Sequence, residues 1–395
     1  MRILMLNANL AGCGTYHRAL WFGRICARTG GHEVTVCTVA PTAALRRTTS
    51  VLDGVRITEG PRWGYTWMPG RGSNWLDILW RWRELRRGGY DIVYAFEYHP
   101  NVAWPVRLGL GRGQALLSDW CDWYAGAANV FRGSTILHAW DRRREEAIRH
   151  AAARVSVISS VLEARALGMG LGPDRVSLLR EGVDTSHMRP HDQAEARRTL
   201  GIAQDARVVA TLTDGHAFPL LAAACAEARH RVPRVCLLLV GSSGPGHRAI
   251  TARAGIADIF VATGRCTDDA LPRLLAAADV FALPLADTLA NRARFPHKLG
   301  DYLACGRATI VSGVGDYPRL LAAAAAALVV PDLAAFPGQL ADLLANEGLR
   351  RQYADRGRAW VARTLDWSVL APEILAFVEG KPVPTPLVTT MEPHV

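Results

Sequence analysis

The sequence has little lysine, no long hydrophobic run and no cluster of cysteines. Only Lys298 and Lys381 are lysines among the 46 lysine and arginine residues, so the formal net charge of +10 comes from arginine. The arginines are dispersed and form no basic tract with interleaved aromatic residues, which argues against a nucleic-acid-binding protein. The longest apolar run, residues 320–330, is too short for a membrane-spanning helix, which needs about 20 residues.

Eight cysteines are present, and no two of them lie closer than eleven residues in the sequence. Neither a zinc clip nor a disulfide framework has this spacing, so we expect no metal site and mostly buried cysteines. The first residues, MRILMLNANLAG, enter a strand-like run without the pattern of a signal peptide, and we expect a cytoplasmic protein. The positive charge favours phosphate-bearing small substrates, or peripheral contact with the inner, anionic membrane face.

Strand-like and helix-like segments alternate along the chain in two successive series. The first series contains RILMLNA, HEVTVCTV, DIVYAFE, ALLSDW and RVSVIS, and the second contains RVVATLT, RVCLLLVG, DIFVATG, DVFALPL and ATIVSG. Apolar strands separated by helical segments indicate parallel sheets that are buried on both faces. The sequence therefore predicts an α/β protein with two doubly wound domains, residues 1–185 and 186–366, that bind ligands at the carboxyl ends of their strands.

A glycine-containing turn, GCGT, follows the first predicted strand. It places Gly14 and Thr15 before a predicted helix, residues 16–29, which Thr15 can cap. Backbone amides at such a turn bind phosphate or sugar groups, but a tight turn without a ligand is equally compatible. The turn lacks the third glycine of a dinucleotide-binding motif and no acidic residue ends the second strand, which disfavours a dinucleotide-dependent oxidoreductase.

In the second predicted domain, Gly241 and Gly264 each follow a strand. Gly241 opens the loop GSSGPG, which either approaches a diphosphate or only turns the chain. Gly264 precedes Arg265 and Cys266, whose backbone is expected at the carboxyl edge of the sheet, a suitable place to bind a nucleotide base.

The segment RFPHKLGDYLACG places Pro296 in the first turn of a helix and Lys298 and Asp301 on one helical face. One interpretation is a surface ion pair. If the helix N-terminus faces a ligand instead, Arg294 and Lys298 form an anion site, and Asp301 accepts hydrogen bonds from a ribose.

Two segments of the first domain are rich in tryptophan. The first is NWLDILWRWRELRRGGY, in which four residues form a hydrophobic stripe on one face of a predicted helix: Trp75, Ile78, Leu79 and Trp82. This stripe either packs on the sheet or docks on a membrane surface. SDWCDWYAG sets Asp119 and Asp122 beside two tryptophans. Aromatic rings stack on sugar faces and carboxylates accept hydroxyl protons, so this segment suits a polyhydroxylated acceptor, although either carboxylate could be satisfied within its loop.

In order and spacing, these segments resemble the retaining glycosyltransferases of family 4, which have the GT-B fold. The similarity covers about residues 1–378 and rests on an ordered set of segments: GCGTYHRALWFGRICARTGGHEVTV, GYDIVYAFE, RVSVISSVLEARALGMG, LLREGVDTSHMRP, LLLVGSSGPG, VATGRCTDDALPRLLAAADVFALPL and PHKLGDYLACGRATIVSGVGDYPRLL. The resemblance implies two Rossmann-like domains that face each other across a cleft and a last helix, residues 367–380, that returns to the first domain. We expect residues 381–395 to be a disordered tail.

The resemblance also implies that the second domain binds a nucleotide sugar and the first domain binds the acceptor. UDP is the favoured nucleotide, with GDP and dTDP as alternatives, and no resident cofactor or metal is implied. The implied donor-binding residues are Gly14, Gly241, Gly264, Arg265, Cys266, Phe295, Pro296, His297, Leu299 and Asp301. The predicted acceptor-binding residues are Thr15, Tyr16, Glu97, Trp120 and Trp123, and the predicted catalytic residues are Lys298, Arg294, Asp119 and Asp122.

Four departures from the family pattern bear on this expectation. The segment TLTDGHAFP lacks the arginine and lysine that usually grip the diphosphate, and we expect Arg294 and Lys298 to supply that charge. Ala293 stands where the first of two glutamates is usual, and residues 119–122 stand where a first-domain histidine is usual. The hinge carries Glu181 in place of asparagine.

The implied reaction is glycosyl transfer with retention at the anomeric carbon. No enzymatic nucleophile is evident, which favours attack on the face that the diphosphate leaves, with positioning and electrostatic stabilisation supplied by the protein and without a metal. Two alternatives stay open: a nucleotide-sugar epimerase of the same fold, and a non-catalytic sugar-nucleotide-binding protein. The arginine bias favours a bacterial natural-product or cell-envelope glycan pathway.

Overall fold

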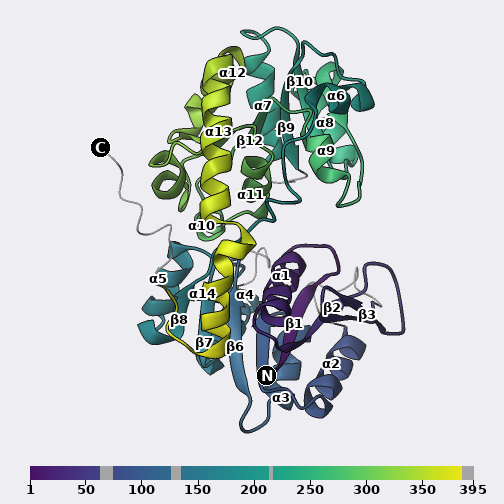
Figure 1. Cartoon of the computed structure of the whole chain (residues 1–395), viewed down its shortest axis with the longest axis vertical. Helices are drawn as coiled ribbons and strands as arrows, with labels where there is room; N and C mark the ends of the chain where they lie inside the picture. Colours follow the sequence, from purple (N-terminus) through teal and green to yellow (C-terminus); the bar gives the residue numbers. More distant parts are fainter. Residues whose placement is uncertain (63–73, 126–134, 213–216, 385–395) are drawn as a thin grey trace. The chain divides into compact units, whose positions relative to one another are not determined.

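The computed structural model describes residues 1–62, 74–125, 135–212 and 217–384 (Figure 1). Contacts divide the described residues into two compact units. Unit 1 contains Met1–Arg180, Ala293–Phe295 and residues 370–384, and unit 2 contains Glu181–Arg292 and Pro296–Val369. Each unit is built on its own sheet, so the predicted pair of doubly wound α/β domains is confirmed.

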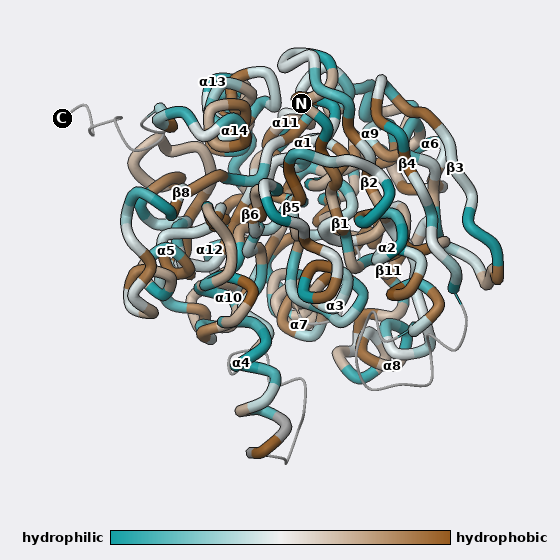
Figure 2. The backbone as a smooth tube through the Cα atoms, turned by 90° about the horizontal axis from the view of Figure 1, so that it is seen from below, coloured by the Kyte–Doolittle hydropathy of each residue, from teal (hydrophilic) through white to brown (hydrophobic). Residues whose placement is uncertain are grey.

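Unit 1 has an eight-stranded sheet with the order β3-β4-β2-β1-β5-β6-β7-β8, and only the edge pair β3 and β4 is antiparallel. The central strands β1 and β5 carry mostly hydrophobic residues (Figure 2), because a parallel strand is covered on both faces. The strands are β1 (Arg2–Leu10), β2 (Glu33–Val39), β3 (Thr48–Leu52), β4 (Val55–Gly60), β5 (Ile92–Phe96), β6 (Ala115–Trp120), β7 (Arg154–Val157) and β8 (Val176–Leu178). The helices are α1 (Thr15–Arg28), α2 (Trp75–Arg87), α3 (Pro100–Gly109), α4 (Thr135–Ala151) and α5 (Ser160–Gly168).

Helix α2 buries a charged pair that the sequence did not predict. Its hydrophobic stripe was expected either to pack on the sheet or to dock on a membrane surface. In the structure Trp75 is exposed, the other three stripe residues are half-buried, and the side chains that α2 buries are those of Asp77, Arg81 and Leu85. Arg81 donates a hydrogen bond of 2.9 Å to Asp77 and one of 2.7 Å to the carbonyl of Asn7 in β1. A buried, hydrogen-bonded ion pair therefore faces the interior, while Trp75 stays 59% exposed.

Unit 2 has a six-stranded parallel sheet with the order β11-β10-β9-β12-β13-β14. Its strands are β9 (Arg207–Leu212), β10 (Val235–Val240), β11 (Phe260–Ala262), β12 (Val280–Leu283), β13 (Ala308–Ser312) and β14 (Leu328–Val330). Its helices are α6 (Gln193–Leu200), α7 (Phe218–Ala228), α8 (Pro245–Arg253), α9 (Leu271–Leu275), α10 (Leu289–Ala293), α11 (His297–Ala304), α12 (Phe336–Ala345) and α13 (Glu347–Thr364). A large apolar core joins α7 and α12 to the central strands.

The last helix, α14 (Trp367–Glu379), begins in unit 2 and continues into unit 1. The ring of Phe377 lies 5.8 Å from that of Tyr94 in β5, and His32 pairs with Glu379 at 3.1 Å. The predicted return of the last helix is thus confirmed, whereas residues 385–395 of the predicted tail lie outside the described residues. None of the helices described here is long and apolar enough to cross a membrane.

Candidate functional site

Two glycine turns meet at the carboxyl edge of the unit 2 sheet. Gly241 follows β10 and Gly264 follows β11, and the two residues form an isolated bridge. The Thr263 hydroxyl accepts a hydrogen bond of 3.1 Å from the Gly241 amide and donates one of 2.8 Å to the Gly264 carbonyl. Arg265 and Cys266 follow in an exposed loop, so the predicted base-binding segment lies at the expected edge.

One histidine and two carboxylates form a cluster at the start of α11. His297 Nδ1 lies 3.2 Å from Glu181 Oε1, and His297 Nε2 lies 3.6 Å from Asp301 Oδ2. Burial alone would lower the pKa of His297, but the carboxylates of Asp301 and Glu181 outweigh it and raise the pKa to about 9. The histidine is therefore a cation at neutral pH, and its side chain is 41% exposed.

Sequence reasoning missed the pairing of His297 with Glu181. Glu181 was noted only as a departure from the family pattern, and its partner is 116 residues away. His297 and Asp301 are four residues apart in one helix, so their proximity could have been inferred from sequence.

Tyr302 fixes α11 against the sheet. Its hydroxyl accepts a hydrogen bond of 2.7 Å from the Leu212 amide at the end of β9, and its ring stacks on Phe281 of β12 at 4.4 Å. Leu299 is fully buried and packs in the core, so only its backbone remains a candidate for donor contact. Lys298 and Pro296 are half-buried at the start of the same helix.

In unit 1, the turn after β1 has the geometry that only glycine tolerates. Gly14 has a φ of 56°, and a Cβ added there would lie 2.8 Å from Asn9 Nδ2. The predicted capping role of Thr15 is wrong. Its hydroxyl donates a hydrogen bond of 2.7 Å to Asn7 Oδ1 and accepts one of 2.8 Å from Asn9 Nδ2, so it ties the turn to β1.

Asp119, a predicted catalytic residue, ends inside unit 1 rather than at an accessible surface. Arg18 donates two hydrogen bonds of 3.0 Å to its two oxygens, and Ser156 and Cys121 donate further ones. Arg18 also donates to the carbonyls of Leu179 and Arg180. Asp119 is fully buried with its oxygens engaged, so the structure gives it a role in holding β6, α1 and the end of β8 together.

Asp122 and Arg294, two further predicted catalytic residues, form an ion pair at 3.5 Å within unit 1. Both side chains are 27% exposed, and Tyr124 donates a hydrogen bond of 3.0 Å to Asp122. The charge of Arg294 is thus partly neutralised by a carboxylate. Phe295, which follows it, is buried with the Arg180 guanidinium 5.5 Å from its ring.

Of the predicted acceptor-binding aromatic residues, only Trp123 is partly exposed. Its ring lies under the Arg165 guanidinium at 4.0 Å, and its indole donates to the Ala125 carbonyl. Trp120 has no exposed surface and Tyr16 is 9% exposed, so neither offers a stacking face. The expectation that Trp120 and Tyr16 form an acceptor platform therefore does not fit their burial.

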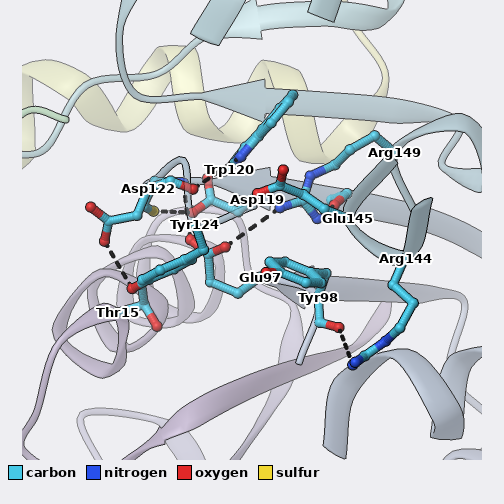
Figure 3. Close-up of polar contacts among 12 residues, drawn as sticks. Thr15, Glu97, Tyr98, Asp119, Trp120, Asp122, Tyr124, Arg144, Glu145 and Arg149 are labelled. Atoms are coloured by element: carbon cyan, nitrogen blue, oxygen red, sulfur yellow. Dashed lines mark hydrogen bonds and ion pairs between the residues drawn. The ribbon is translucent and has the colours of Figure 1, made fainter. Parts of the chain in front are cut away.

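Glu97, also predicted to bind the acceptor, belongs to a buried charged cluster (Figure 3). It follows β5 with a φ of 71°, accepts a hydrogen bond of 3.1 Å from the Cys121 amide, and lies 3.5 Å from Arg149. Burial raises the pKa of Glu97 well above its usual range, since Arg149 compensates only in part. Burial likewise raises the pKa of the neighbouring Glu145 to about 7.

Within the described ranges, no group of three or more histidine, cysteine or acidic side chains is placed to hold a metal ion. The segment TLTDGHAFP, which departs from the family pattern, is described only in part, because residues 213–216 lie outside the described residues.

Comparison with known proteins now identifies the class. The chain matches two family models: "Glycosyltransferase Family 4" over residues 26–187 and "Glycosyl transferases group 1" over residues 206–346. The chain belongs to the family 4, or group 1, glycosyltransferases, as its ordered motifs predicted. Its fold is also that of the sucrose-phosphate synthase from Thermosynechococcus elongatus, with a TM-score of 0.74 at 20% identity over 94% of this chain and 96% of that one.

Individual relatives share about 30% identity with this chain, and only over part of its length. A D-inositol 3-phosphate glycosyltransferase from Segniliparus rotundus is 31% identical over 220 residues, which are 52% of this chain and 46% of the relative. A GDP-mannose-dependent alpha-(1-6)-phosphatidylinositol monomannoside mannosyltransferase from Mycobacterium tuberculosis is 28% identical over 57% of this chain and 61% of its own length. The chain therefore matches about half the length of these relatives.

Proposed function

We propose that this protein transfers a sugar from a nucleotide-sugar donor to a hydroxyl of a small-molecule or glycan acceptor, with retention at the anomeric carbon. The observation that carries the proposal is the carboxyl edge of the unit 2 sheet. There the tied turns at Gly241 and Gly264 expose backbone, and α11 presents a partly exposed cation, His297, beside Asp301. Family membership supports the same reaction.

In this proposal Asp301 accepts hydrogen bonds from the donor ribose, and the cations at the start of α11 attract its diphosphate. The α11 N-terminus adds positive potential to His297 and Lys298. Because Arg294 is paired with Asp122, we expect it to attract the diphosphate less strongly than Lys298 does.

No carboxylate of the unit 2 edge is proposed as a nucleophile. Asp301 is 4% exposed and pairs with His297, and a group held in this way is better suited to positioning than to attack. We propose that the acceptor hydroxyl attacks the face that the diphosphate leaves, that the departing phosphate takes the hydroxyl proton, and that the protein stabilises the developing negative charge. Activity should survive EDTA, and complete loss that magnesium or manganese restores would contradict this mechanism.

The nucleotide is tested by a thermal-shift screen of UDP, GDP and dTDP followed by calorimetry. A ligand at 100 times its Kd stabilises the folded state by about 2.7 kcal/mol, so one nucleotide should stand out. UDP is our first expectation, and GDP is the main competitor because the mycobacterial relative is named for GDP-mannose. A Lys298→Ala variant should bind that nucleotide more weakly, with Lys381→Ala as the matched control, since these are the two lysines of the chain. Unchanged affinity in Lys298→Ala would refute the charge assignment.

Acceptors are tested by incubation with the selected nucleotide sugar and a panel of polyols. The two curated relatives are named for inositol 3-phosphate and for a phosphatidylinositol monomannoside, so these acceptors come first. Transfer yields nucleoside diphosphate and a new glycoside with the donor's anomeric configuration by NMR. Isomerisation of the donor without acceptor would favour an epimerase, and donor binding without any turnover would favour a non-catalytic binding protein. We place the reaction in a bacterial natural-product or cell-envelope glycan pathway, in the cytoplasm.

The outer face of α2 and α3 supports a further part of the proposal, contact with an anionic membrane surface. The two helices lie side by side (Figure 1), joined by hydrogen bonds from Asn101 to Asp77 and from Trp82 to the Leu108 carbonyl. Trp75, Trp104 and Leu108 are 59%, 40% and 60% exposed on these helices. Exposed aromatic residues with a cationic surround favour the interface of an anionic bilayer.

The charge of this face has one sign. The exposed charged residues of α2 and α3 are Arg83, Arg86, Arg87 and Arg107, while Asp77 is buried and Glu84 binds Tyr90. We expect sedimentation with vesicles that contain phosphatidylglycerol and little with phosphatidylcholine alone. A Trp75→Ser/Trp104→Ser variant should lose this binding, while Trp140→Ser, which alters a tryptophan on α4 that is 49% exposed, should keep it. Equal binding to both kinds of vesicle, or equal losses in both variants, would contradict membrane contact at this face.

A further inference from the structure

A cavity of about 340 Å³ opens at the amino-terminal edge of the unit 2 sheet. Arg207 is the first residue of β9, Asp279 directly precedes β12, and Arg307 directly precedes β13, and all three line the cavity. The glycine turns proposed for the donor follow β10 and β11 and therefore lie at the opposite edge of the same sheet. This cavity is a separate feature that the proposed glycosyl transfer does not use.

Five arginines and only two carboxylates line this cavity: Arg197, Arg207, Arg307, Arg350, Arg351, Asp279 and Glu347. The arginines come from four separate parts of unit 2: α6, the start of β9, the turn after α11 and the first turns of α13. Guanidinium groups from distant parts of a sequence that converge on one cavity are the arrangement that binds phosphate groups in proteins.

The two carboxylates are already engaged by two of the arginines. Asp279 accepts hydrogen bonds of 2.8 Å from Arg197 and 2.7 Å from the Val208 amide. Glu347 pairs with Arg351 at 2.5 Å on the exposed surface of α13. The lining therefore carries an excess of three positive charges.

The remaining arginines have only backbone partners or none. Arg307 donates to the carbonyls of Ala276 and His191, and its buried Nε has no hydrogen-bond partner among the described residues. Arg350, which is 8% exposed, donates to two carbonyls at the end of α12. For Arg207, no side-chain hydrogen bond or ion pair is present in the part of the chain that the structure describes.

The electrostatics of the cavity oppose its positive charges. Burial lowers the pKa of Arg307 and of Arg350, and the charge of Asp279 offsets this only in part, while the charge of Arg197 acts against both arginines. The charge of Arg207 also acts against that of Arg350. Like charges held together at partly buried positions cost free energy, and an anion in the cavity would offset that cost.

We propose that this cavity binds a small anion that carries two or more phosphate groups. The excess of three positive charges matches the charge of such an anion, and each guanidinium can donate paired hydrogen bonds to phosphate oxygens. The volume equals that of about eleven waters at ~30 Å³ each, more than a single phosphate fills. The inference stands on the cavity alone and does not depend on the proposed glycosyl transfer.

The test is calorimetric titration of the full chain with pyrophosphate and with orthophosphate, in the presence of a saturating concentration of the nucleotide selected by the screen above, so that any donor site is filled. We expect one saturable site that binds pyrophosphate more tightly than orthophosphate. Arg207→Gln should raise the Kd for pyrophosphate about tenfold, because it removes a guanidinium that has no structural partner. Arg351→Gln should raise it less, because Arg351 is 78% exposed and already paired.

The matched control is Arg356→Gln, the same charge change at an exposed position of α13 outside the cavity lining. It should bind pyrophosphate as the wild type does. In phosphate-free buffer, Arg207→Gln should unfold at the same temperature as the wild type or a higher one, since it relieves repulsion. The proposal is overturned if no saturable pyrophosphate binding occurs beside the bound nucleotide, or if Arg207→Gln and Arg356→Gln bind pyrophosphate equally. Failure of UDP, GDP and dTDP all to bind would count against the proposed function, and the comparison of Arg207→Gln with Arg356→Gln would still test the cavity.

Discussion

The carboxyl edges of the two sheets carry similar residues but use them differently. In unit 1, Asp119 lies in β6 and is buried, and Arg18 and Ser156 occupy its oxygens. In unit 2, Asp301 lies in α11 and pairs with a histidine that is itself 41% exposed. The comparison teaches that a buried acidic residue stays a candidate for ligand contact when its partner is partly exposed, and not when a buried arginine occupies its oxygens.

The difference arises from the helix that supplies the partner. Arg18 lies on α1, is 1% exposed and reaches both Asp119 and two carbonyls of the chain after β8. A buried guanidinium of this kind needs a carboxylate to compensate it. His297 can lose or keep its proton, so its carboxylate partners keep a role that responds to pH and to ligands.

The largest expected effect comes from breaking the unit 1 pair. Asp119→Ala should reduce the free energy of unfolding by about 3–5 kcal/mol, because it leaves the buried Arg18 without its carboxylate. Urea denaturation measures the change. The double variant Arg18→Leu/Asp119→Ala should recover part of the loss, and a cost below about 1 kcal/mol in Asp119→Ala would show that the pair is not a structural anchor.

The next effect concerns the unit 2 edge. Asp301→Asn should weaken nucleotide binding by about 10- to 100-fold, since hydrogen bonds to a charged group contribute about 1.5–3 kcal/mol. Calorimetry with the nucleotide selected above measures it, with Asp355→Asn at an exposed position of α13 in the same unit as the control. If both variants bind with wild-type affinity, Asp301 does not hold the donor.

A smaller loss of unfolding free energy is expected in the turn after β1, where two glycine variants distinguish backbone strain from steric contact. Gly14→Ala should cost about 1–2 kcal/mol from its positive φ, with an added cost from the contact with Asn9. Gly12→Ala has a φ of 76° but meets nothing within 4 Å, so it reports the backbone cost alone. Equal losses of unfolding free energy in the two variants would exclude a contribution from Asn9.

The smallest effect is a pH dependence at His297, because solvent screens the pairing of a side chain that is 41% exposed. Its pKa rises from 6.5 to about 9 on folding, so its pairing contributes stability fully below pH 6.5 and loses it as the pH rises toward 9. The difference in unfolding free energy between the wild type and His297→Asn should therefore shrink from pH 6 to pH 9.5. A difference that stays constant over this range would show that the histidine is not charged by its carboxylates.

The sequence was sufficient to predict the alternation of strands and helices, because apolar runs such as those of β1 and β10 are long and continuous. It did not predict which side chains α2 buries, because hydropathy assigns aspartate and arginine to the surface. The buried Asp77 and Arg81 find their partners in Asn101 and in the carbonyl of Asn7, which are distant in sequence.

The candidate site was predictable to a similar degree. The positions of Gly241 and Gly264 at one edge followed from the topology of a parallel sheet. The partners of Asp119 could not be predicted, because Arg18 is 101 residues away and a carboxylate beside tryptophans suits either a ligand or a buried cation. Residue type and spacing were thus sufficient to predict that the site lies at the carboxyl edge of the sheet. Only the tertiary contacts distinguish buried structural residues, such as Asp119, from groups that a ligand can reach.

Hydrogen exchange with and without the selected nucleotide tests the central claim most directly. We expect added protection in peptides that cover residues 241–247, 263–270 and 295–301 at the carboxyl edge of the unit 2 sheet. Peptides that cover 115–121 in unit 1 should exchange alike in both conditions, since Asp119 and its neighbours are already buried and hydrogen-bonded. Protection confined to unit 1, or none at the unit 2 edge while the nucleotide is bound, would contradict the account.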